Sequence, residues 1–310
     1  MPPRTITGSP TVISVPGNGC EDVLIGPDGA IYTGTDDGLI HRVDAETRES
    51  AVVARTKGRP LGLEWLPDGR LLVCDARKGL LAVDIETGKV RTLVGLVMGR
   101  PMRFCNNATV ARNGDVWFSD STTEHGVECW REEIAEHTCT GRLMRMRPDG
   151  TVTVELDGLA FANGVVLASD ESFVAVAQTG RREVTRLWLN GPRAGASEPL
   201  CRDLPGYPDN LSRHGERIWI TLASPRSRTL ETLQTRMPRR VRRTVLRMPR
   251  SVQPDVKRTV RVIAVDDQGR TTRDVDLDAE HFHMVTGARE HDGRLYLGSI
   301  VEPAVAVIDL

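Results

Sequence analysis

Short alternating apolar runs, each introduced by a tight-turn signal, recur along the whole chain. They read GPDGAIYTG (26–34), LPDGRLLVCD (66–75), ARNGDVWFSD (111–120), ASDESFVAVAQ (168–178), SRHGERIWITL (212–222) and EHDGRLYLGS (290–299). Alternation with a period of two predicts strands that bury one face, and the turn signals predict hairpins. Further strands follow, as in GLIHRVD (38–44), GLLAVD (79–84) and GRLMRMRPDG (141–150). Each unit is therefore predicted to be a four-stranded antiparallel meander.

Six meanders predict an all-β fold, a six-bladed β-propeller that forms a single domain over residues 1–310, because radial repetition hides the sheet edges. Two intervals between units are longer than the others, which places inserts at 122–140 and 225–261. In the second insert, apolar residues recur at three- and four-residue steps, and two prolines interrupt them. This pattern predicts an amphipathic cap of two helices. The stripe consists of Leu230, Leu233, Met237, Val241, Val245 and Met248, and the prolines are Pro238 and Pro249.

One position of the repeat carries candidate chemistry. About eight residues before each turn glycine stand Glu21, Leu61, Asn106, Asn163, Asp209 and Thr286. Innermost strands of a propeller begin at one mouth of the central channel, so these positions are predicted to form a ring. Leu61 is the exception in a set of oxygen-bearing side chains. Ca²⁺ takes six or more oxygen ligands, and the ring therefore predicts a cation site made of Glu21, Asn106, Asn163 and Asp209.

The same residues have a simpler interpretation. Asn163 precedes a glycine and Asp209 precedes an asparagine, and both pairs are common in turns because Asn and Asp tolerate left-handed backbone. Taken one at a time, each residue is explained by its turn. The shared phase of four oxygen-bearing residues favours the metal ring.

Composition restricts the class of protein. The 310 residues are 39% hydrophobic and 27% charged, as in ordinary globular proteins, and no apolar run reaches the length of a membrane span. The first residues lack the apolar region of a signal peptide, so we expect a soluble, cytoplasmic protein. Six cysteines without a C-x-x-C pair favour reduced thiols and give no zinc motif, although Cys129 and Cys139 are near enough in sequence to pair.

Charge is concentrated in the second insert. Residues 225–261 contain eleven Arg and one Lys against Glu231 and Asp255, a net charge of +10, and the whole chain sums to −1. Three interpretations stay open: a cap with a solvated Arg face, a wall of the substrate entrance, or a peripheral membrane contact. Nucleic-acid binding is not expected, because the insert has no interleaved aromatic residues and the rest of the chain is acidic.

Several of these segments resemble one known family. GCEDV (19–23), GRPLGLEWLPDGRLLVCDARKGLLAVD (58–84), NNATVARNGDVWFSDST (106–122), FANGVVLASDESFVAVAQT (161–179), GYPDNL (206–211) and EHDGRLYLGS (290–299) are similar to the strictosidine-synthase-like proteins of the regucalcin/gluconolactonase superfamily. The resemblance implies a six-bladed propeller whose hydrolytic members bind Ca²⁺ in the channel. It also implies that Glu21, Asn106, Asn163 and Asp209 are the ligands, with Asp209 as general base or nucleophile.

Two departures from the family shape the functional prediction. Strictosidine synthase uses a glutamate where this chain has Thr286, so a condensation by that mechanism is disfavoured. Membrane-anchored relatives have an N-terminal span that is not found here, which agrees with the soluble expectation.

We therefore predict a Ca²⁺-dependent hydrolase that acts on a lactone or a related activated ester, with a small molecule as substrate. Arg103, Thr286 and His283 are predicted to contact the substrate. The alternatives are a strictosidine-synthase-like lyase or cyclase that uses the same cavity, and a non-catalytic propeller that only binds a ligand.

Overall fold

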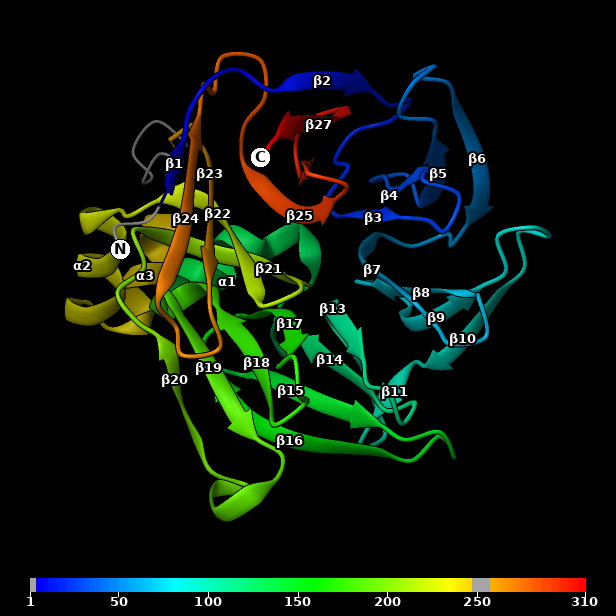
Figure 1. Ribbon diagram of the computed structural model, residues 1–310. Helices are drawn as coiled ribbons and strands as arrows, with labels where there is room; N and C mark the ends of the chain where they lie inside the picture. The colour runs from blue at the N-terminus through cyan, green and yellow to red at the C-terminus, as the bar shows by residue number, and fades with distance from the viewer. Residues whose placement is uncertain (1–3, 247–256) are drawn as a thin grey trace.

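The computed structural model describes residues 4–246 and 257–310, whose strands form six blades around a central axis (Figure 1). Each blade is an antiparallel meander, and its innermost strand lies next to the axis. The predicted six-bladed propeller is confirmed. The turn signals act as expected. In the first, Gly29 has a φ of 76° and donates its N–H to the carbonyl of Gly26 at 2.9 Å, a conformation that favours glycine.

The first three blades follow the chain in order. The first has β3 (Val23–Ile25), β4 (Ile31–Gly34), β5 (Leu39–Val43) and β6 (Ser50–Arg55). The second has β7 (Pro60–Trp65), β8 (Leu71–Asp75), β9 (Gly79–Val83) and β10 (Val90–Val94). A hairpin of β11 (Leu96–Val97) and β12 (Arg100–Pro101) leads to the third, which has β13 (Cys105–Val110), β14 (Val116–Asp120), β15 (Gly141–Met146) and β16 (Val152–Leu159).

The last three blades complete the ring. The fourth has β17 (Ala162–Leu167), β18 (Phe173–Gln178), β19 (Glu183–Trp188) and β20 (Ser197–Cys201), with 3₁₀ turns η2 (Thr179–Arg181) and η3 (Gly191–Arg193). The fifth has β21 (Gly206–His214), β22 (Arg217–Pro225), β23 (Val260–Val265) and β24 (Thr271–Leu277), to which β1 (Arg4–Ile6) adds in parallel. The sixth has β25 (Val285–His291), β26 (Arg294–Ser299) and β27 (Ala304–Asp309), and β2 (Thr11–Ser14) is its outer strand.

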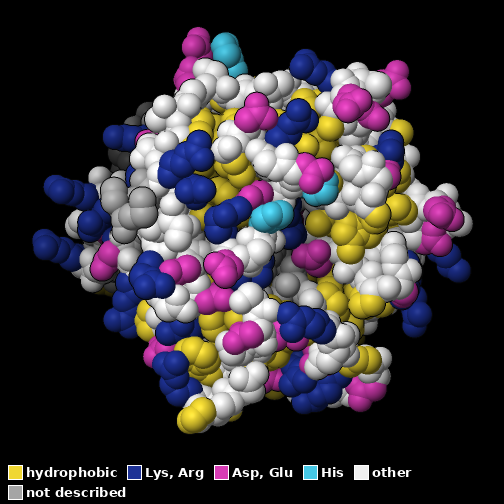
Figure 2. Space-filling view, viewed as in Figure 1, with side chains coloured by type: hydrophobic (Ala, Val, Ile, Leu, Met, Phe, Trp, Pro, Cys, Tyr) yellow, Lys and Arg dark blue, Asp and Glu magenta, His cyan; other side chains and the backbone are white. Residues whose placement is uncertain are grey.

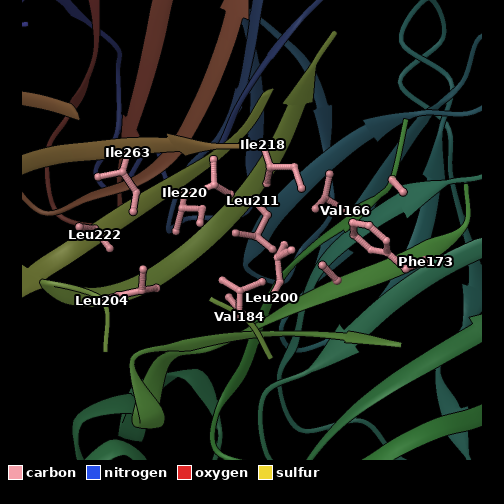
Figure 3. Packing of buried hydrophobic residues seen from close by; sticks show 14 residues of the cluster. Val166, Phe173, Val184, Leu200, Leu204, Leu211, Ile218, Ile220, Leu222 and Ile263 are labelled. Carbon is pink, nitrogen blue, oxygen red and sulfur yellow. The ribbon is translucent and has the colours of Figure 1, made fainter. Parts of the chain in front are cut away.

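The core lies between adjacent blades. Figure 3 shows one such layer, in which Ile218 and Ile220 of β22 extend toward Val166, Phe173 and Val184 of the fourth blade. All five side chains are buried. Both faces of each blade are covered in this way by its neighbours. The middle strands are therefore apolar on both sides, as in β8 (Leu71–Asp75) and β18 (Phe173–Gln178).

The two inserts form one lid. The first contains η1 (Val127–Cys129) and α1 (Trp130–Glu136), and the second contains α2 (Arg228–Arg236) and α3 (Arg239–Leu246). Helix α1 packs against both α2 and α3, and Gln234 Nε2 donates to the carbonyl of Ile134 at 2.7 Å. We call α1, α2 and α3 the lid helices. An ion pair of 2.7 Å between Arg182 and Glu231 fixes α2 to the fourth blade.

The predicted helical cap is confirmed, with one correction to its apolar stripe. Pro238 separates α2 from α3 as expected, and Leu233 is buried. Met237 and Val241, however, are 40% and 43% exposed, because α3 reaches α1 through Arg residues instead of through the stripe. Met248 and Pro249 lie outside the described residues.

All six cysteines carry free thiols in this structure, Cys129 and Cys139 included. In the part of the chain that the structure describes, no helix has the length and apolar character needed to cross a membrane.

Candidate metal centre in the central channel

The innermost strands are irregular at the ring positions. In five blades the pairing of the first two strands shifts register, between Pro60 and Leu63, Cys105 and Ala108, Ala162 and Val165, Pro208 and Leu211, and Val285 and Gly287. Every ring residue of these blades falls within its shift, and Glu21 stands just before β3. A β-bulge interrupts the alternation of the ladder and redirects a side chain. Here the bulges turn side chains toward the axis.

The four predicted ligands meet at one cavity of about 80 Å³ between the channel mouth and the lid helices. Its polar side chains are Glu21, Asn106, Asn163, Thr179, Asp209 and Ser224. Its other lining residues are Leu61, Phe104, Trp130, Ile134, Phe161, Tyr207, Ala223, Leu230, Met284 and Ile300. The cavity thus has an oxygen-rich floor and mostly apolar walls.

Three oxygens of the ring are buried without a hydrogen-bond partner. Asn106 Nδ2 donates to Ser121 Oγ at 3.0 Å, and Asn163 Nδ2 donates to Thr179 Oγ1 at 3.2 Å, which leaves both Oδ1 atoms free. Glu21 Oε2 has no donor either. An unpaired buried polar atom costs about 1–3 kcal/mol, so a cluster of three is unfavourable unless something binds there. A cation that accepts oxygen ligands fits this arrangement.

The floor is held by hydrogen bonds that cross between blades. Asn210 Nδ2 donates to Glu21 Oε1 at 3.1 Å, which joins the fifth blade to the first. The N–H of Leu63 donates to Asp22 Oδ2 at 3.0 Å, and the N–H of Val165 donates to Asn107 Oδ1 at 2.9 Å. The ring is therefore positioned by the innermost strands themselves.

Glycines allow these strands to approach one another. A Cβ atom on Gly62 would lie 2.7 Å from the carbonyl oxygen of Asn106, and one on Gly287 would lie 2.6 Å from Asp22 Oδ1. Such distances are shorter than real Cβ contacts, so the residue next to the ring must be glycine in these blades.

The electrostatics of the floor also favour a bound cation. Burial raises the pKa of Asp209 to about 7. Hydrogen bonds from the Asn163 side chain and from the backbone N–H of Asn210 oppose the shift, and the negative charge of Asp22 adds to it. Burial, with the charges of Asp209 and Asp22, holds the pKa of Glu21 well above its usual range. Two carboxylates in one dry site repel each other, and a positive ion between them removes that repulsion.

The donor set determines which cation fits. Among residues 4–246 and 257–310, no three His, Cys, Asp or Glu side chains converge as a ligand cluster. The cavity instead combines two carboxylates with two amide oxygens. Oxygen ligands of this kind suit a hard cation such as Ca²⁺, whose coordination also includes water.

The structure does not bring Arg103, Thr286 or His283 into the cavity. Arg103 is exposed in the connection that precedes β13. His283 pairs with Glu302 outside the channel. Thr286 is buried on the ring, but its Oγ1 donates to the carbonyl of Glu21 at 2.7 Å. Its hydroxyl thereby holds the main chain of a ring residue instead of facing a substrate.

Other residues of the site were not identified from the sequence. Ser121 and Thr179 orient the two amides, and Trp130, Ile134 and Leu230 extend from the lid helices into the cavity. Trp130 and Ile134 are four residues apart, so the sequence spacing predicts that they share one face of a helix. What the pattern lacks is the direction in which that face points.

The comparisons with known proteins concern the family and the fold. Residues 30–221 match the sequence model of the SMP-30/gluconolactonase/LRE-like region, and residues 10–43 match that of the strictosidine synthase-like N-terminal region. The adipocyte plasma membrane-associated protein of Salmo salar is 31% identical over 321 residues, which cover 94% of this chain and 77% of that protein.

Solved structures share the fold at lower identity. A gluconolactonase from Xanthomonas campestris has a TM-score of 0.71 at 16% identity and covers 96% of this chain and 88% of its own. A calcium-binding regucalcin from Agrobacterium tumefaciens has a TM-score of 0.69 at 14% identity, with 98% and 95% covered. Both likenesses concern the fold.

The raised pKa of Asp209 predicts how an Asn substitution changes stability in a chelator. The folded protein holds this proton more tightly than the unfolded chain, so its free energy of unfolding falls as pH rises from about 4 to about 7. Asp209→Asn removes this pH-dependent loss of unfolding free energy, because the amide does not ionise. We expect the melting temperature of the variant, relative to wild type, to rise by several degrees between pH 5 and pH 8. The exposed control Asp157→Asn should show no such trend, and a difference in melting temperature between Asp209→Asn and wild type that is the same at pH 5 and pH 8 would contradict the assignment.

Proposed function

Because the chain belongs to the SMP-30/gluconolactonase/LRE-like family, we propose that its channel binds Ca²⁺ and hydrolyses a lactone or a related activated ester. The observation that carries the proposal is the convergence of three unpartnered buried oxygens and the Asp209 carboxylate on one cavity. The gluconolactonase and the calcium-binding regucalcin that share the fold support it.

The proposed ligands are Glu21, Asn106, Asn163 and Asp209. Their two carboxylates match the charge of a divalent ion, and other divalent cations fit the same donor set. When bound, the ion supplies Lewis-acid polarisation of the substrate carbonyl. The protein keeps both amide oxygens directed at the site, because Ser121 and Thr179 hold the amide nitrogens.

Asp209 is the proposed base or nucleophile. Glu21 is only 2% exposed, and one of its oxygens is held by Asn210. Asp209 is less deeply buried and faces the cavity. In the first route, its carboxylate takes a proton from water while the water oxygen forms the bond to the carbonyl carbon. In the second route, the carboxylate itself attacks that carbon and gives an acyl-enzyme, which water then cleaves. In both routes a lactone gives a ring-opened hydroxy acid, and an ester gives a carboxylic acid and an alcohol.

The walls favour an apolar substrate. Aromatic and aliphatic side chains surround the floor, and a hydroxyl buried against them without a partner costs about 1–3 kcal/mol. A polyhydroxylated sugar lactone would bury several such hydroxyl groups. Since the cavity measures about 80 Å³, admission of a lactone with an alkyl or aryl substituent requires the lid helices to move outward.

A condensing lyase of the strictosidine synthase type is the second candidate, and the match at residues 10–43 favours it. Against it, Thr286 replaces the glutamate of that mechanism, and its hydroxyl is already bonded to the Glu21 carbonyl.

Calcium should stabilise the folded protein. A ligand that binds only the folded state at 100 times its Kd adds about 2.7 kcal/mol to the free energy of unfolding. We expect Ca²⁺ to raise the melting temperature over that in EDTA, and more at pH 8 than at pH 5, because the carboxyls must be ionised to bind. Glu21→Gln should remove most of the shift, whereas the exposed control Glu216→Gln should keep it. Equal shifts in both variants would exclude the ring as the binding site.

Hydrolysis should depend on Asp209. With a panel of lactones and aryl esters in excess Ca²⁺, we expect Asp209→Asn to lower kcat by about 10²- to 10⁴-fold, the usual contribution of a positioned base, while Asp157→Asn stays at the wild-type rate. Acid release in a pH-stat measures both. If Ca²⁺ stabilises the protein but no member of the panel is hydrolysed, the hydrolase proposal fails and the binding or lyase alternatives replace it.

The apolar walls predict a trend in substrate size. Across γ-lactones with longer alkyl chains, kcat/KM should rise by about fourfold per buried methylene, which corresponds to about 0.8 kcal/mol each. Trp130→Ala should flatten the series, because its ring lines the cavity, and Val241→Ala on the exposed side of the lid should not. Faster turnover of a sugar lactone than of the alkyl series would refute the assigned substrate class.

A further inference from the structure

The lid and an exposed hairpin lie at the same mouth of the channel. The innermost strands begin next to the cavity, so the connections that lead into them are at this mouth, and the β11–β12 hairpin is one of them. The second strand of each blade runs back to the same end, and the lid helices and the β26–β27 connection (300–303) follow such strands. We call the surface formed by this hairpin, the lid helices and residues 300–303 the lid face.

Exposed apolar side chains gather on the lid face. The large hydrophobic side chains that are exposed among the described residues are Val52, Leu96, Met98, Met237, Val241 and Val301. Five of these six belong to the lid face; Val52 alone lies elsewhere, on the outer strand β6. Single exposed hydrophobics are ordinary, but their concentration around one opening is not.

The hairpin holds one of these side chains outward at a conformational cost. Leu96 pairs with Pro101 and Val97 with Arg100, which leaves Met98 and Gly99 as a two-residue turn with φ of 52° and 75°. Turns with two positive φ values favour Asn-Gly or Gly-Gly, and a non-glycine residue in this region costs about 1–2 kcal/mol. Met98 is 86% exposed, so no contact within the chain explains its presence. Ten other non-glycine residues among those described also have positive φ, so the exposure of Met98, and not its backbone alone, distinguishes the tip.

Charge is polarised along the same axis. On the lid helices, Arg239 and Arg243 pair with Glu136, whereas Arg228, Arg236 and Arg240 are exposed and have no ion-pair partner among the described residues. Figure 2 shows basic side chains at the left edge of the molecule, over α2 and α3. At the other end of the channel every blade contributes an aspartate to its turns: Asp28, Asp68, Asp149, Asp170, Asp266 and Asp292. Three of them pair with an arginine there, Asp28 with Arg42, Asp68 with Arg70 and Asp266 with Arg270, so the contrast with the lid face rests on the other three. Such a distribution orients the lid face toward a negatively charged surface.

We propose that the lid face docks on an anionic lipid surface. Leu96, Met98 and Val301 enter the interface, and the unpaired arginines of α2 and α3 contact lipid phosphates. A lipid surface offers both chemistries together, because apolar chains lie directly beneath the charged layer. A polyanion such as nucleic acid or an acidic protein would neutralise the arginines but leave Met98 in water. Docking in this orientation places the apolar cavity where apolar molecules leave the bilayer.

Sedimentation with vesicles tests the proposal without reference to catalysis. We expect the full-length protein to bind vesicles of 70% phosphatidylcholine and 30% phosphatidylserine at 50 mM salt, to dissociate at 500 mM salt, and to bind pure phosphatidylcholine much more weakly. Leu96→Ser with Met98→Ser should weaken partitioning by about tenfold, from the lost burial of two side chains. Arg236→Ala with Arg240→Ala should weaken it by about tenfold as well, and should reduce its salt dependence.

Val52→Ser is the matched control, because it truncates an exposed apolar side chain away from the lid face. It should leave partitioning unchanged, and circular dichroism should show that every variant is folded. The proposal is overturned if the protein does not bind the phosphatidylserine vesicles at 50 mM salt, or if Val52→Ser weakens binding as much as the hairpin variant does. It is also overturned if the arginine variant weakens vesicle binding, the hairpin variant does not, and heparin abolishes binding. That outcome indicates a soluble polyanion as the partner.

Discussion

The site depends on the bulge at the start of the innermost strand in five of the six blades. A regular ladder would alternate its side chains between the two neighbouring blades and send none along the axis. The register shifts in β7, β13, β17, β21 and β25 break this alternation at the ring positions. Glycines beside the ring let the strands approach, and the side chains of Asp22 and Asn107 bond to the next blade. The architecture and the floor of the cavity therefore have one physical origin.

The repeat explains why much of this was predictable. Equivalent phases of successive units occupy equivalent places around an axis, so Glu21, Asn106, Asn163 and Asp209 meet although they are distant in sequence. Residues outside the repeat have no such constraint. Arg103 and His283 lie in irregular connections whose side-chain directions the pattern does not encode. Thr286 is on the ring, yet its short hydroxyl reaches a neighbouring carbonyl first. The cavity walls were not predictable, because they depend on how two separate inserts pack together.

The lid combines weak and strong attachments. Leu233 is buried and the Arg182–Glu231 pair is largely shielded, so the start of α2 is firmly fixed. The pairs from Arg239 and Arg243 to Glu136 involve half-exposed guanidinium groups, and exposed pairs contribute about 0–1 kcal/mol. The contact between α1 and α3 thus relies on ion pairs to the buried carboxylate of Glu136, and it borders the apolar side chains of α1 that line the cavity.

The pairing of the two ends of the chain has a consequence for biosynthesis. Strand β2 completes the blade that β27 ends, and β1 adds to the neighbouring blade through β24. Strands β1 and β2 are therefore translated well before the strands with which they pair, β24 and β27. Five blades have all of their meander strands before the final hairpin appears, but the ring remains open until then. A nascent chain that stalls after β25 would expose the edge of β25 and an unpaired β2, both of which are templates for association with other chains.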